Sequence, residues 1–593
     1  MSVEQATSTF TAAIEAYQRG AFNDAERLFA EALQLNPAWA EAAYNRALML
    51  LQLSRANEGL ECLNRALEIR PEYPAALCTR AGFWASVGQA ERALRDYSAA
   101  LTFNPQHLES LNNVAALYRQ QGQFNEALAS YDRAIAISPD IPVLHYNRGV
   151  VLGELKRGEE AISAYERALT LDDRYAEAHY NLGVLLAEIN RYDEALQHYD
   201  QALAVNPGDA RVMNNRGATL LALQRLDDAL LCLNLLLAVQ PNFVEALNNR
   251  AATLREIGRI DDAIADVDRA LAIDPTNLES NWHRSMLYLL CGDLPRGFAL
   301  YERRWERGSD APRRRSTNLP LWLGKQDLRG KTILIWGEQG LGDQLMMARY
   351  VPLLAERGAT VLLEVDAPLI TLFRTLKGVK RVGKYGEFGE AAQFQCPMMS
   401  LPLAFGTTTE TIPTNAPYLS VPAARVAYWA EKLGPKIKPR IGVMWSGGQQ
   451  AKIRNRSIPL DVFSRLFSDD FEWISLQKEV LPSDQPTLSA LTTLRHFGDE
   501  QDDFMDASAI CELVDVVVTV DTSIAHLASA LARPTQVLLP FSADWRWMLN
   551  RDDSPWYPTS SLFRQFMGTD WDQPLAKVKS AVNGAIRKMT PAS

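Results

Sequence analysis

Prolines recur every 34 residues through the first half of the chain, and no other feature of the sequence constrains the fold as strongly. They stand at Pro37, Pro71, Pro105, Pro139, Pro207, Pro241 and Pro275, and Asp173 takes the one missing place. Small residues keep the same step, as at Ala47, Ala81, Ala115, Gly149, Gly183, Gly217, Ala251 and Ser285. Because proline ends a helix and a small side chain lets two helices approach closely, the period predicts a stack of helix pairs.

This pattern strongly resembles the tetratricopeptide repeat, over about eight full repeats and a partial ninth between residues 6 and 306. The resemblance implies an α-solenoid, a superhelix of helix pairs with a concave groove. We therefore expect a repeat domain over residues 1–307 that binds a protein. Repeats alone do not identify that partner.

Asparagine occupies one position of the first helix in most repeats, two residues before the small residue. The series comprises Asn45, Asn113, Asn147, Asn181, Asn215 and Asn249. An amide both donates and accepts hydrogen bonds, so a row of amides suits an extended peptide backbone. The series resembles the asparagine ladder in the repeats of the nucleocytoplasmic O-linked N-acetylglucosamine transferase, which implies a peptide-binding groove. The alternative is that each asparagine bonds to the neighbouring repeat.

Composition excludes several classes of function. The net charge of -10 argues against a nucleic-acid-binding protein, which normally carries a basic face. The six cysteines include no CxxC pair, so neither a zinc site nor a disulfide framework is indicated. The start, MSVEQATSTF, is not typical of a signal peptide, and no apolar run reaches the ~18 residues that span a bilayer. We expect a reduced, cytoplasmic protein with no membrane insertion.

Six arginines cluster after the last repeat, at Arg303, Arg304, Arg307, Arg313, Arg314 and Arg315. Their density around a Ser-Asp-Ala-Pro break favours a solvated linker, which we place at residues 308–330. The alternative is that they dock onto an acidic surface of a partner or of the domain that follows.

From Lys331 onward, short apolar runs alternate with helical patterns. An apolar run (331–336) leads into the glycine turn GEQGLGD (337–343) and then into a helix expected at 344–357. Further strands are expected at 359–365, 379–385, 440–445, 471–477, 515–520 and 535–540, and helices at 368–376 and 524–532. Alternating strands and helices predict parallel sheets, and a second glycine turn after residue 445 predicts two of them. We place the two lobes at 331–425 and 426–593, with ligand at the carboxyl ends of the strands.

Two segments carry a more specific resemblance. GEQGLGDQLMMARYVPLL, from Gly337, and VDTSIAHLASAL, from Val520, are similar to the signature segments of the lipopolysaccharide heptosyltransferase-like glycosyltransferases. That family has the GT-B fold, in which two Rossmann-like lobes face a cleft. RSIPL (456–460), SLQK (475–478) and DWRWMLNRDDSPWYP (544–558) resemble the bacterial subgroup that joins this domain to tetratricopeptide repeats, flagellin glycosyltransferases among them.

The resemblance implies transfer of a sugar to Ser or Thr of flagellin, with inversion and without a metal ion or other cofactor. The donor in that subgroup is a nucleotide sugar, such as CMP-linked pseudaminic acid or another nonulosonic acid. GxxGxG is not the dinucleotide spacing, and the next strand ends in no acidic residue except Glu364 or Asp366, so an NAD enzyme is disfavoured.

Asp343 matches the position of the family's proposed general base. A Ser or Thr hydroxyl is a poor nucleophile until its proton is being removed, so a carboxylate is required there. Gly340 and Gly342 leave the carboxylate open to the cleft and are assigned to the donor side. The alternative is that Asp343 caps a helix that begins at Gln344.

Donor binding is assigned to the second lobe. Asp521, Thr522 and Ser523 stand where a strand meets a helix N-terminus, which suits a phosphate. Asp521 itself would repel phosphate, so we assign it to sugar hydroxyls or to the helix cap. The resemblance adds His526, for which the alternative is a helix residue satisfied inside the fold. Arg456 and Lys478 match basic positions that would stabilise the departing phosphate. Trp545, Trp547, Trp556 and Tyr557 offer stacking surfaces for a base, although core packing is the alternative.

Two other functions remain open at this stage. One is a protein-binding scaffold whose GT-B domain is inactive or only senses a nucleotide. The other is a glycosyltransferase whose acceptor is a glycan or a lipid.

Overall fold

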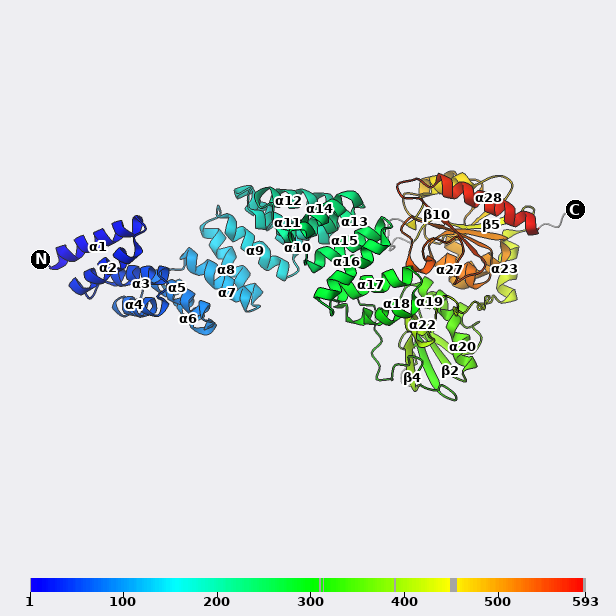
Figure 1. Cartoon of the computed structure of the whole chain (residues 1–593), viewed down its shortest axis with the longest axis horizontal. Coiled ribbons are helices and arrows are strands. Elements are labelled where there is room, and N and C mark those ends of the chain that lie inside the picture. The colour runs from blue at the N-terminus through cyan, green and yellow to red at the C-terminus, as the bar shows by residue number, and fades with distance from the viewer. Residues whose placement is uncertain (1, 309–310, 313, 389–390, 448–455, 590–593) are drawn as a thin grey trace. The chain divides into compact units, whose positions relative to one another are not determined.

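The computed structural model describes residues 2–308, 311–312, 314–388, 391–447 and 456–589 (Figure 1). Contacts divide the chain into two compact units, residues 1–225 and 226–593. Among the described residues, no helix combines the length and the apolar character that a membrane-spanning segment needs.

The first unit consists of antiparallel helix pairs, as the 34-residue period predicts. Its helices are α1 (Ser2–Gln18), α2 (Phe22–Leu35), α3 (Ala40–Gln52), α4 (Ala56–Ile69), α5 (Pro74–Ser86), α6 (Ala90–Phe103), α7 (Leu108–Gln120), α8 (Phe124–Ile137), α9 (Pro142–Glu154), α10 (Gly158–Leu171), α11 (Ala176–Glu188), α12 (Tyr192–Val205) and α13 (Ala210–Ala222). The periodic prolines follow the second helix of a pair, as Pro37 follows α2, and the periodic alanines Ala47, Ala81 and Ala115 are fully buried. The solenoid prediction is confirmed.

The second unit begins with the remaining repeats: α14 (Leu226–Val239), α15 (Val244–Glu256), α16 (Ile260–Ile273), α17 (Leu278–Leu290), α18 (Leu294–Tyr301) and the 3₁₀ turn η1 (Glu302–Glu306). Leu289, Phe298 and Tyr301 belong to the same buried cluster as Ile333 and Leu345 of the α/β part. The last helix pair therefore shares its core with the sheets, which explains why the compact unit starts at Leu226 rather than after the repeats.

The first sheet contains four parallel strands in the order β3-β2-β1-β4. The strands are β1 (Thr332–Trp336), β2 (Thr360–Val365), β3 (Val379–Lys384) and β4 (Phe394–Pro397). β1 is central, with Ile333 opposite Val361 on one side and Phe394 on the other. The sequence did not predict β4, because FQCP is short and ends in proline.

The helix expected at 344–357 is broken into α19 (Leu341–Met347), the 3₁₀ turn η3 (Ala348–Tyr350) and α20 (Val351–Glu356). Pro352 lies in the first turn of α20 and has no N–H for the preceding turn, so one continuous helix was a wrong prediction. The helix expected at 368–376 is reduced to η4 (Ala367–Leu369) and α21 (Ile370–Phe373), and η5 (Met398–Ser400) and α22 (Leu401–Ala404) follow β4.

The second sheet contains six parallel strands in the order β10-β9-β8-β5-β6-β7. The strands are β5 (Arg440–Met444), β6 (Glu472–Ser475), β7 (Leu494–Arg495), β8 (Val516–Val520), β9 (Thr535–Leu539) and β10 (Ser560–Arg564). The helical elements are α23 (Ala423–Leu433), α24 (Leu460–Phe463), η7 (Ser464–Leu466), α25 (Gln485–Ala490), η8 (Gly498–Glu500), α26 (Phe504–Leu513), α27 (Ser523–Ala530), η9 (Trp545–Trp547) and α28 (Asp572–Met589). Two parallel sheets were predicted and are present, whereas β7 and β10 were missed.

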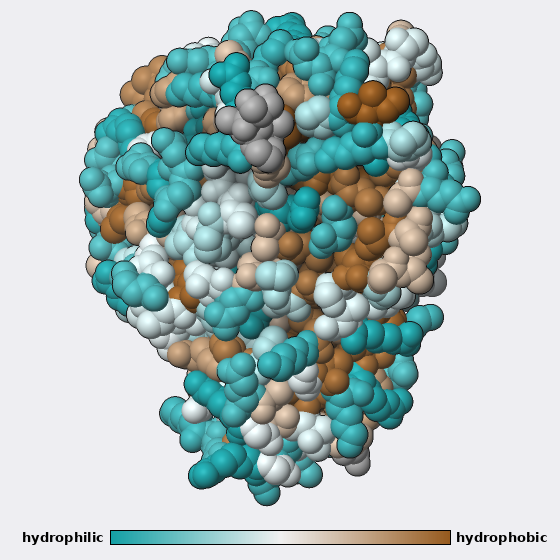
Figure 2. All heavy atoms as spheres, turned by 90° about the vertical axis from the view of Figure 1, so that its right-hand side faces the viewer, coloured by the Kyte–Doolittle hydropathy of each residue, from teal (hydrophilic) through white to brown (hydrophobic). Residues whose placement is uncertain are grey.

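Each face of the second sheet is covered differently. Ile441, Val443 and Val518 pack with Leu575 and Val578 of α28, which lies along one side of the sheet in Figure 1. The opposite face joins the large cluster that extends to the first sheet. Figure 2 shows the molecule from the right-hand side of Figure 1, with hydrophobic and hydrophilic side chains intermixed on that face.

The arginine cluster is not simply a solvated linker. Arg304 Nη2 donates to Glu338 Oε1 (3.0 Å) and to Ser400 Oγ (2.8 Å), and Arg304 is almost fully buried. Arg315 Nε and Nη2 donate to the two oxygens of Glu364 at 2.8 and 3.1 Å. These two arginines dock onto the first lobe, as the alternative proposed, while Arg313 lies outside the described residues.

Glu364 receives further bonds from the backbone N–H groups of Gly386 (2.9 Å) and Phe388 (2.8 Å). Burial alone raises the pKa of Glu364, but the bonds to Arg315 and to these amides outweigh it, and the pKa is lowered. The linker region also packs on the sheet, since the Trp322 side chain is fully buried and the backbone N–H of Trp322 donates to Gln395 O at 2.9 Å.

We expect Arg315→Ala to lower the free energy of unfolding by about 3–5 kcal/mol, because it leaves the buried Glu364 carboxylate without its cation. Urea unfolding followed by tryptophan fluorescence measures the change. Arg314→Ala is the matched control, because Arg314 is the exposed neighbour. Equal urea midpoints for Arg315→Ala and Arg314→Ala would show that the Arg315–Glu364 pair is not needed for stability.

Candidate functional site

The glycine turn after β1 places Asp343 at the carboxyl end of the first sheet. α19 begins at Leu341 with Gly340 as its N-cap residue (φ -59°, ψ 167°), so Asp343 lies inside the first helical turn. The alternative that Asp343 caps a helix starting at Gln344 is therefore wrong. An acidic side chain in this turn also interacts favourably with the helix dipole.

Asp343 is paired with an arginine of the second lobe that sequence reasoning did not select. Arg546 Nε donates to Asp343 Oδ1 at 2.8 Å, and Arg546 Nη2 donates to the same oxygen. The two side chains are only 14% and 13% exposed. Arg546 belongs to η9, within the DWRW segment. It is far from Asp343 in the sequence, and only the tryptophans on either side of it were considered as candidate ligand-binding residues.

The pairing continues into a chain of alternating charges. Arg546 Nη1 donates to Asp544 Oδ1 (2.5 Å), and Arg456 Nη2 donates to Asp544 Oδ2 (3.0 Å). Arg456 Nη1 lies 3.3 Å from Asp521 Oδ2. We call Asp343, Arg546, Asp544, Arg456 and Asp521 the charge chain. Of the predicted site residues, it brings Asp343, Arg456 and Asp521 together.

Asp521 and Asp544 of the charge chain have pKa values shifted in opposite directions. Burial raises the pKa of Asp521, and the nearby Arg456 offsets this only in part. Burial also raises the pKa of Asp544, but Arg546 and Arg456 outweigh it, so the pKa is lowered. Asp544 is thus the firmly ionised member that holds the two guanidinium groups in place.

Helix α27 presents the predicted donor residues against the turn that carries Asp343. Thr522 is the N-cap residue, and its hydroxyl lies 3.2 Å from Thr519 Oγ1 rather than capping the helix. A methyl group added at Gly342 would lie 2.8 Å from His526 Cδ2 and 3.6 Å from the Cα of Ser523. Glycine at 342 is therefore what lets α19 approach α27 so closely.

His526 forms part of this contact as a neutral ring. It stacks on Trp547 with ring centroids 5.4 Å apart, and its Nδ1 lies 3.0 Å from the Tyr557 hydroxyl. Burial, together with the cations Arg546 and Arg349, lowers the pKa of His526 to about 3. The imidazole is consequently uncharged at neutral pH and supports the packing between the two lobes.

Lys478 lies apart from these residues. Its Nζ donates to the backbone oxygen of Asp502 at 2.9 Å, and no contact of the described residues joins it to the charge chain. Trp545, Trp547, Trp556 and Tyr557 are all buried, which agrees with core packing rather than with an exposed stacking surface.

The last repeats reach the site directly. Phe298 packs edge-on against Trp545, with ring centroids 5.6 Å apart, and the buried Tyr301 follows on the same helix. Arg304 bonds to Glu338, which lies in the turn that carries Asp343. Burial raises the pKa of Glu338 to about 7 despite Arg304, and its Oε2 has no hydrogen-bond partner. The end of the solenoid thus supports both sides of the Asp343–Arg546 pair.

Within the first unit, the asparagine series makes contacts between repeats. Asn181 Nδ2 donates to Tyr146 OH (3.2 Å), and Asn215 Nδ2 donates to Tyr180 OH (3.3 Å). Asn147 Nδ2 bonds to Asn112 Oδ1 at 3.4 Å, and Asn113 Nδ2 lies 4.0 Å from Cys78 Sγ. These bonds are the ones that the alternative reading of the series expects. Asn45 lies on α3 and Asn249 on α15.

The carboxylates that a dinucleotide would need at the end of β2 are engaged elsewhere. Glu364 is bound by Arg315, and Asp366 Oδ2 accepts a hydrogen bond from Gln344 Nε2 at 2.8 Å. The first contact holds the linker on the lobe, and the second supports the glycine turn, since Gln344 Nε2 also donates to Gln339 O at 2.9 Å.

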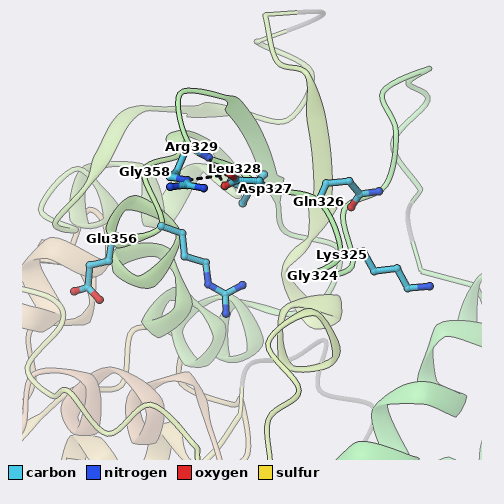
Figure 3. Close-up of a pocket in the computed structure, with 9 residues that line it drawn as sticks. Gly324, Lys325, Gln326, Asp327, Leu328, Arg329, Glu356 and Gly358 are labelled. Carbon is cyan, nitrogen blue, oxygen red and sulfur yellow. Dashed lines mark hydrogen bonds and ion pairs between the residues drawn. The ribbon is translucent and has the colours of Figure 1, made fainter.

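A separate surface pocket of about 650 Å³ lies at the opposite end of the first sheet (Figure 3). It is lined by residues 324–329 and 356–358, which precede β1 and β2. Within it, Arg329 Nε donates to Asp327 Oδ2 at 2.9 Å. Because Asp343 lies at the carboxyl ends of the strands, this pocket is not part of the candidate site.

The first half of the chain contains tetratricopeptide repeats. The model described as "TPR repeat" matches residues 115–156 and 154–190, and models described as "Tetratricopeptide repeat" match residues 10–74, 176–209 and 214–277. These matches confirm the repeat assignment. They do not extend into the two parallel sheets.

A particular relative is Protein FlbA of Caulobacter vibrioides, 29% identical over 336 residues. The match covers 50% of this chain and 54% of FlbA, so the chain spans about half the length of that relative.

Solved structures with some likeness include Pseudomonas aeruginosa pilF, at 22% identity and a TM-score of 0.32, covering 35% of this chain and 94% of that one. A tetratricopeptide repeat protein from Parabacteroides merdae has 22% identity and a TM-score of 0.35, covering 40% and 93%. At these TM-scores neither likeness carries information on function.

We expect Gly342→Ala to lower the free energy of unfolding by about 1–3 kcal/mol, because its methyl group meets the immobile His526 ring. Urea unfolding followed by tryptophan fluorescence measures the change. Gly340→Ala is the control, since a methyl group there meets nothing closer than Asp343 Oδ2 at 3.7 Å. A variant at 342 as stable as that control would contradict the close approach of α19 and α27.

Proposed function

We propose that this protein is a metal-independent, inverting glycosyltransferase that transfers a sugar from a nucleotide donor to Ser or Thr of a protein. In this proposal the two sheets work as the lobes of a GT-B fold, and the repeats bind the acceptor. The proposal rests above all on one observation: Asp343, in the first turn of α19 after β1, pairs with Arg546 of the second lobe, next to Gly342, which packs against α27.

The chemistry suits this position. Transfer to a hydroxyl requires a base that removes its proton while the sugar develops oxocarbenium character. Asp343 Oδ1 is held by Arg546. Its Oδ2 has no bond to another described residue and is the oxygen we assign to the acceptor hydroxyl.

The donor is assigned to the second lobe. The N-terminal N–H groups of α27 at Thr522 and Ser523 suit a phosphate, and Arg456 lies beside Asp521 at the end of β8. Guanidinium groups stabilise a departing phosphate without a metal ion. We propose CMP as the nucleotide because of the family resemblance. Lys478 is not included among the residues that stabilise the departing phosphate, since it bonds to Asp502 O instead.

Flagellin is our preferred acceptor. The segments at 456–460, 475–478 and 544–558 resemble the flagellin glycosyltransferases, and we take the similarity to Protein FlbA as support for a flagellar role. We also propose that the protein acts in the cytoplasm.

A protein-binding scaffold is the second candidate function. Two observations favour it: the ladder amides bond to neighbouring repeats, and Asp343 is paired with Arg546. In a scaffold both arrangements would be purely structural, and neither would change on ligand binding.

Asp343→Asn should abolish transfer while flagellin binding is retained, because the amide keeps the shape but cannot take up the proton. Thermal shifts with CMP, UDP, GDP and ADP first identify the nucleotide. The matching nucleotide sugar and purified flagellin are then followed by intact-protein mass. Asp327→Asn, at the far end of the same sheet, is the control. Transfer by Asp343→Asn at the wild-type rate would exclude Asp343 as the base.

The ladder can be tested with two variants that remove the same hydrogen bond. Asn181→Ala and Tyr146→Phe each lose the 3.2 Å bond and about 1 kcal/mol of stability. If Asn181 also contacts the acceptor, only Asn181→Ala weakens flagellin binding, which calorimetry measures. Equal affinities for the two variants would restrict the ladder to packing between repeats.

A further inference from the structure

The charge chain contains more carboxylates than cations. Asp343, Asp544 and Asp521 face two guanidinium groups, those of Arg456 and Arg546. Each guanidinium is shared between two carboxylates. An anionic ligand that entered this cluster would find both cations already neutralised, so it would have to displace a carboxylate from one of them.

Of the two carboxylates that share Arg546, Asp343 is held by fewer bonds than Asp544. Asp544 accepts bonds from Arg546 N (3.1 Å), Arg546 Nη1 (2.5 Å) and Arg456 Nη2 (3.0 Å). Asp343, by contrast, is bonded to Arg546 alone, and only through Oδ1. Asp343 also comes from the other lobe, whereas Asp544 is the N-cap residue of η9 itself.

We propose that Arg546 is an anion-exchange residue, which pairs with Asp343 in the unliganded protein and with a phosphate group of the bound nucleotide in its place. Arg546 Nε and Nη2 form the fork that now holds Asp343, and a phosphate accepts such a fork with two parallel hydrogen bonds. This inference rests on the proposed function, because it takes the nucleotide to be the donor's.

The exchange couples donor binding to the base. In the unliganded protein, Arg546 Nε and Nη2 tie the Asp343 carboxylate to the second lobe through Oδ1. Once a phosphate occupies Arg546, this tie is gone and the carboxylate is free to turn toward an acceptor hydroxyl. The unliganded protein therefore keeps its base paired, and donor binding makes it available.

Coupling between two sites is reciprocal, so the Asp343–Arg546 pair must affect nucleotide affinity if the nucleotide affects the pair. This distinguishes the exchange from a role in which Arg546 only positions Asp343. If Asp343 competes with phosphate for Arg546, then removing its charge must strengthen nucleotide binding. If Arg546 only orients Asp343, the same substitution leaves nucleotide affinity unchanged.

The experiment measures CMP and UDP binding by calorimetry to the wild type, Asp343→Asn, Arg546→Gln and the double variant. We expect Asp343→Asn to bind the preferred nucleotide about fivefold more tightly than the wild type. Arg546→Gln should bind it at least about tenfold more weakly, in line with the loss of a charged hydrogen-bonded partner. In the Arg546→Gln background, Asp343→Asn should have no further effect.

Controls separate the phosphate from the rest of the ligand. Cytidine and uridine lack phosphate, so their affinities should be the same for the wild type and Asp343→Asn. Asp366→Asn removes a carboxylate of the same lobe that bonds to Gln344 instead of Arg546, and should leave nucleotide affinity within about twofold. Arg546→Lys keeps the charge and replaces Arg546→Gln if that variant unfolds.

Unchanged or weaker nucleotide binding by Asp343→Asn overturns the exchange but leaves the proposed transferase intact. Tighter nucleotide binding by Asp343→Asn, together with no sugar transfer by the wild type, supports the exchange and counts against the transferase. Absence of nucleotide binding in both the wild type and Asp343→Asn overturns both.

Discussion

The close packing of α19 against α27 is the contact on which the candidate site depends. It is possible because Gly342 carries no side chain where His526 and Ser523 approach it. The same contact sets Asp343 of the first lobe beside Arg546 of the second. Asp343 and Arg546, which are separated by most of the α/β region in sequence, thereby form a buried ion pair. Arg546 is bonded in turn to Asp544, and Arg456 connects Asp544 to Asp521.

The end of the solenoid is built into this site rather than attached beside it. Phe298 contacts Trp545, Arg304 bonds to Glu338 before the glycine turn, and the last helix pair shares its core with both sheets. Buried ion pairs such as Arg304–Glu338 and Arg315–Glu364 add little net stability, since desolvation offsets most of their attraction. They do fix one docking geometry, because a displaced guanidinium would leave a carboxylate buried without a partner.

Sequence reasoning succeeded where the signal was periodic or local. The repeats and the central strands followed from spacing and apolar runs. The place of Asp343 after a strand and a glycine turn was also readable locally, whereas its role as a base was taken from the family resemblance and stays a prediction. Sequence reasoning failed where the deciding contact is distant in sequence. Arg546 was overlooked among tryptophans, Arg315 was taken for a solvated charge, and Lys478 was assigned to a site that it does not join. The partner of a single charged residue cannot be identified from the sequence. β4 and β7 were missed because they are too short to show an alternating or apolar pattern.

The sequence by itself determined the architecture: a 34-residue helical period, followed by strands and helices that must form parallel sheets, with carboxylate and glycine at the end of the first strand. These features are set by backbone preferences and by side-chain spacing within a few turns. Only the tertiary structure decided which charges meet, that Asp343 is paired, that His526 is neutral, and that the last repeats share the core of the sheets. Those properties depend on burial and on distances between segments far apart in the chain, which no local pattern encodes.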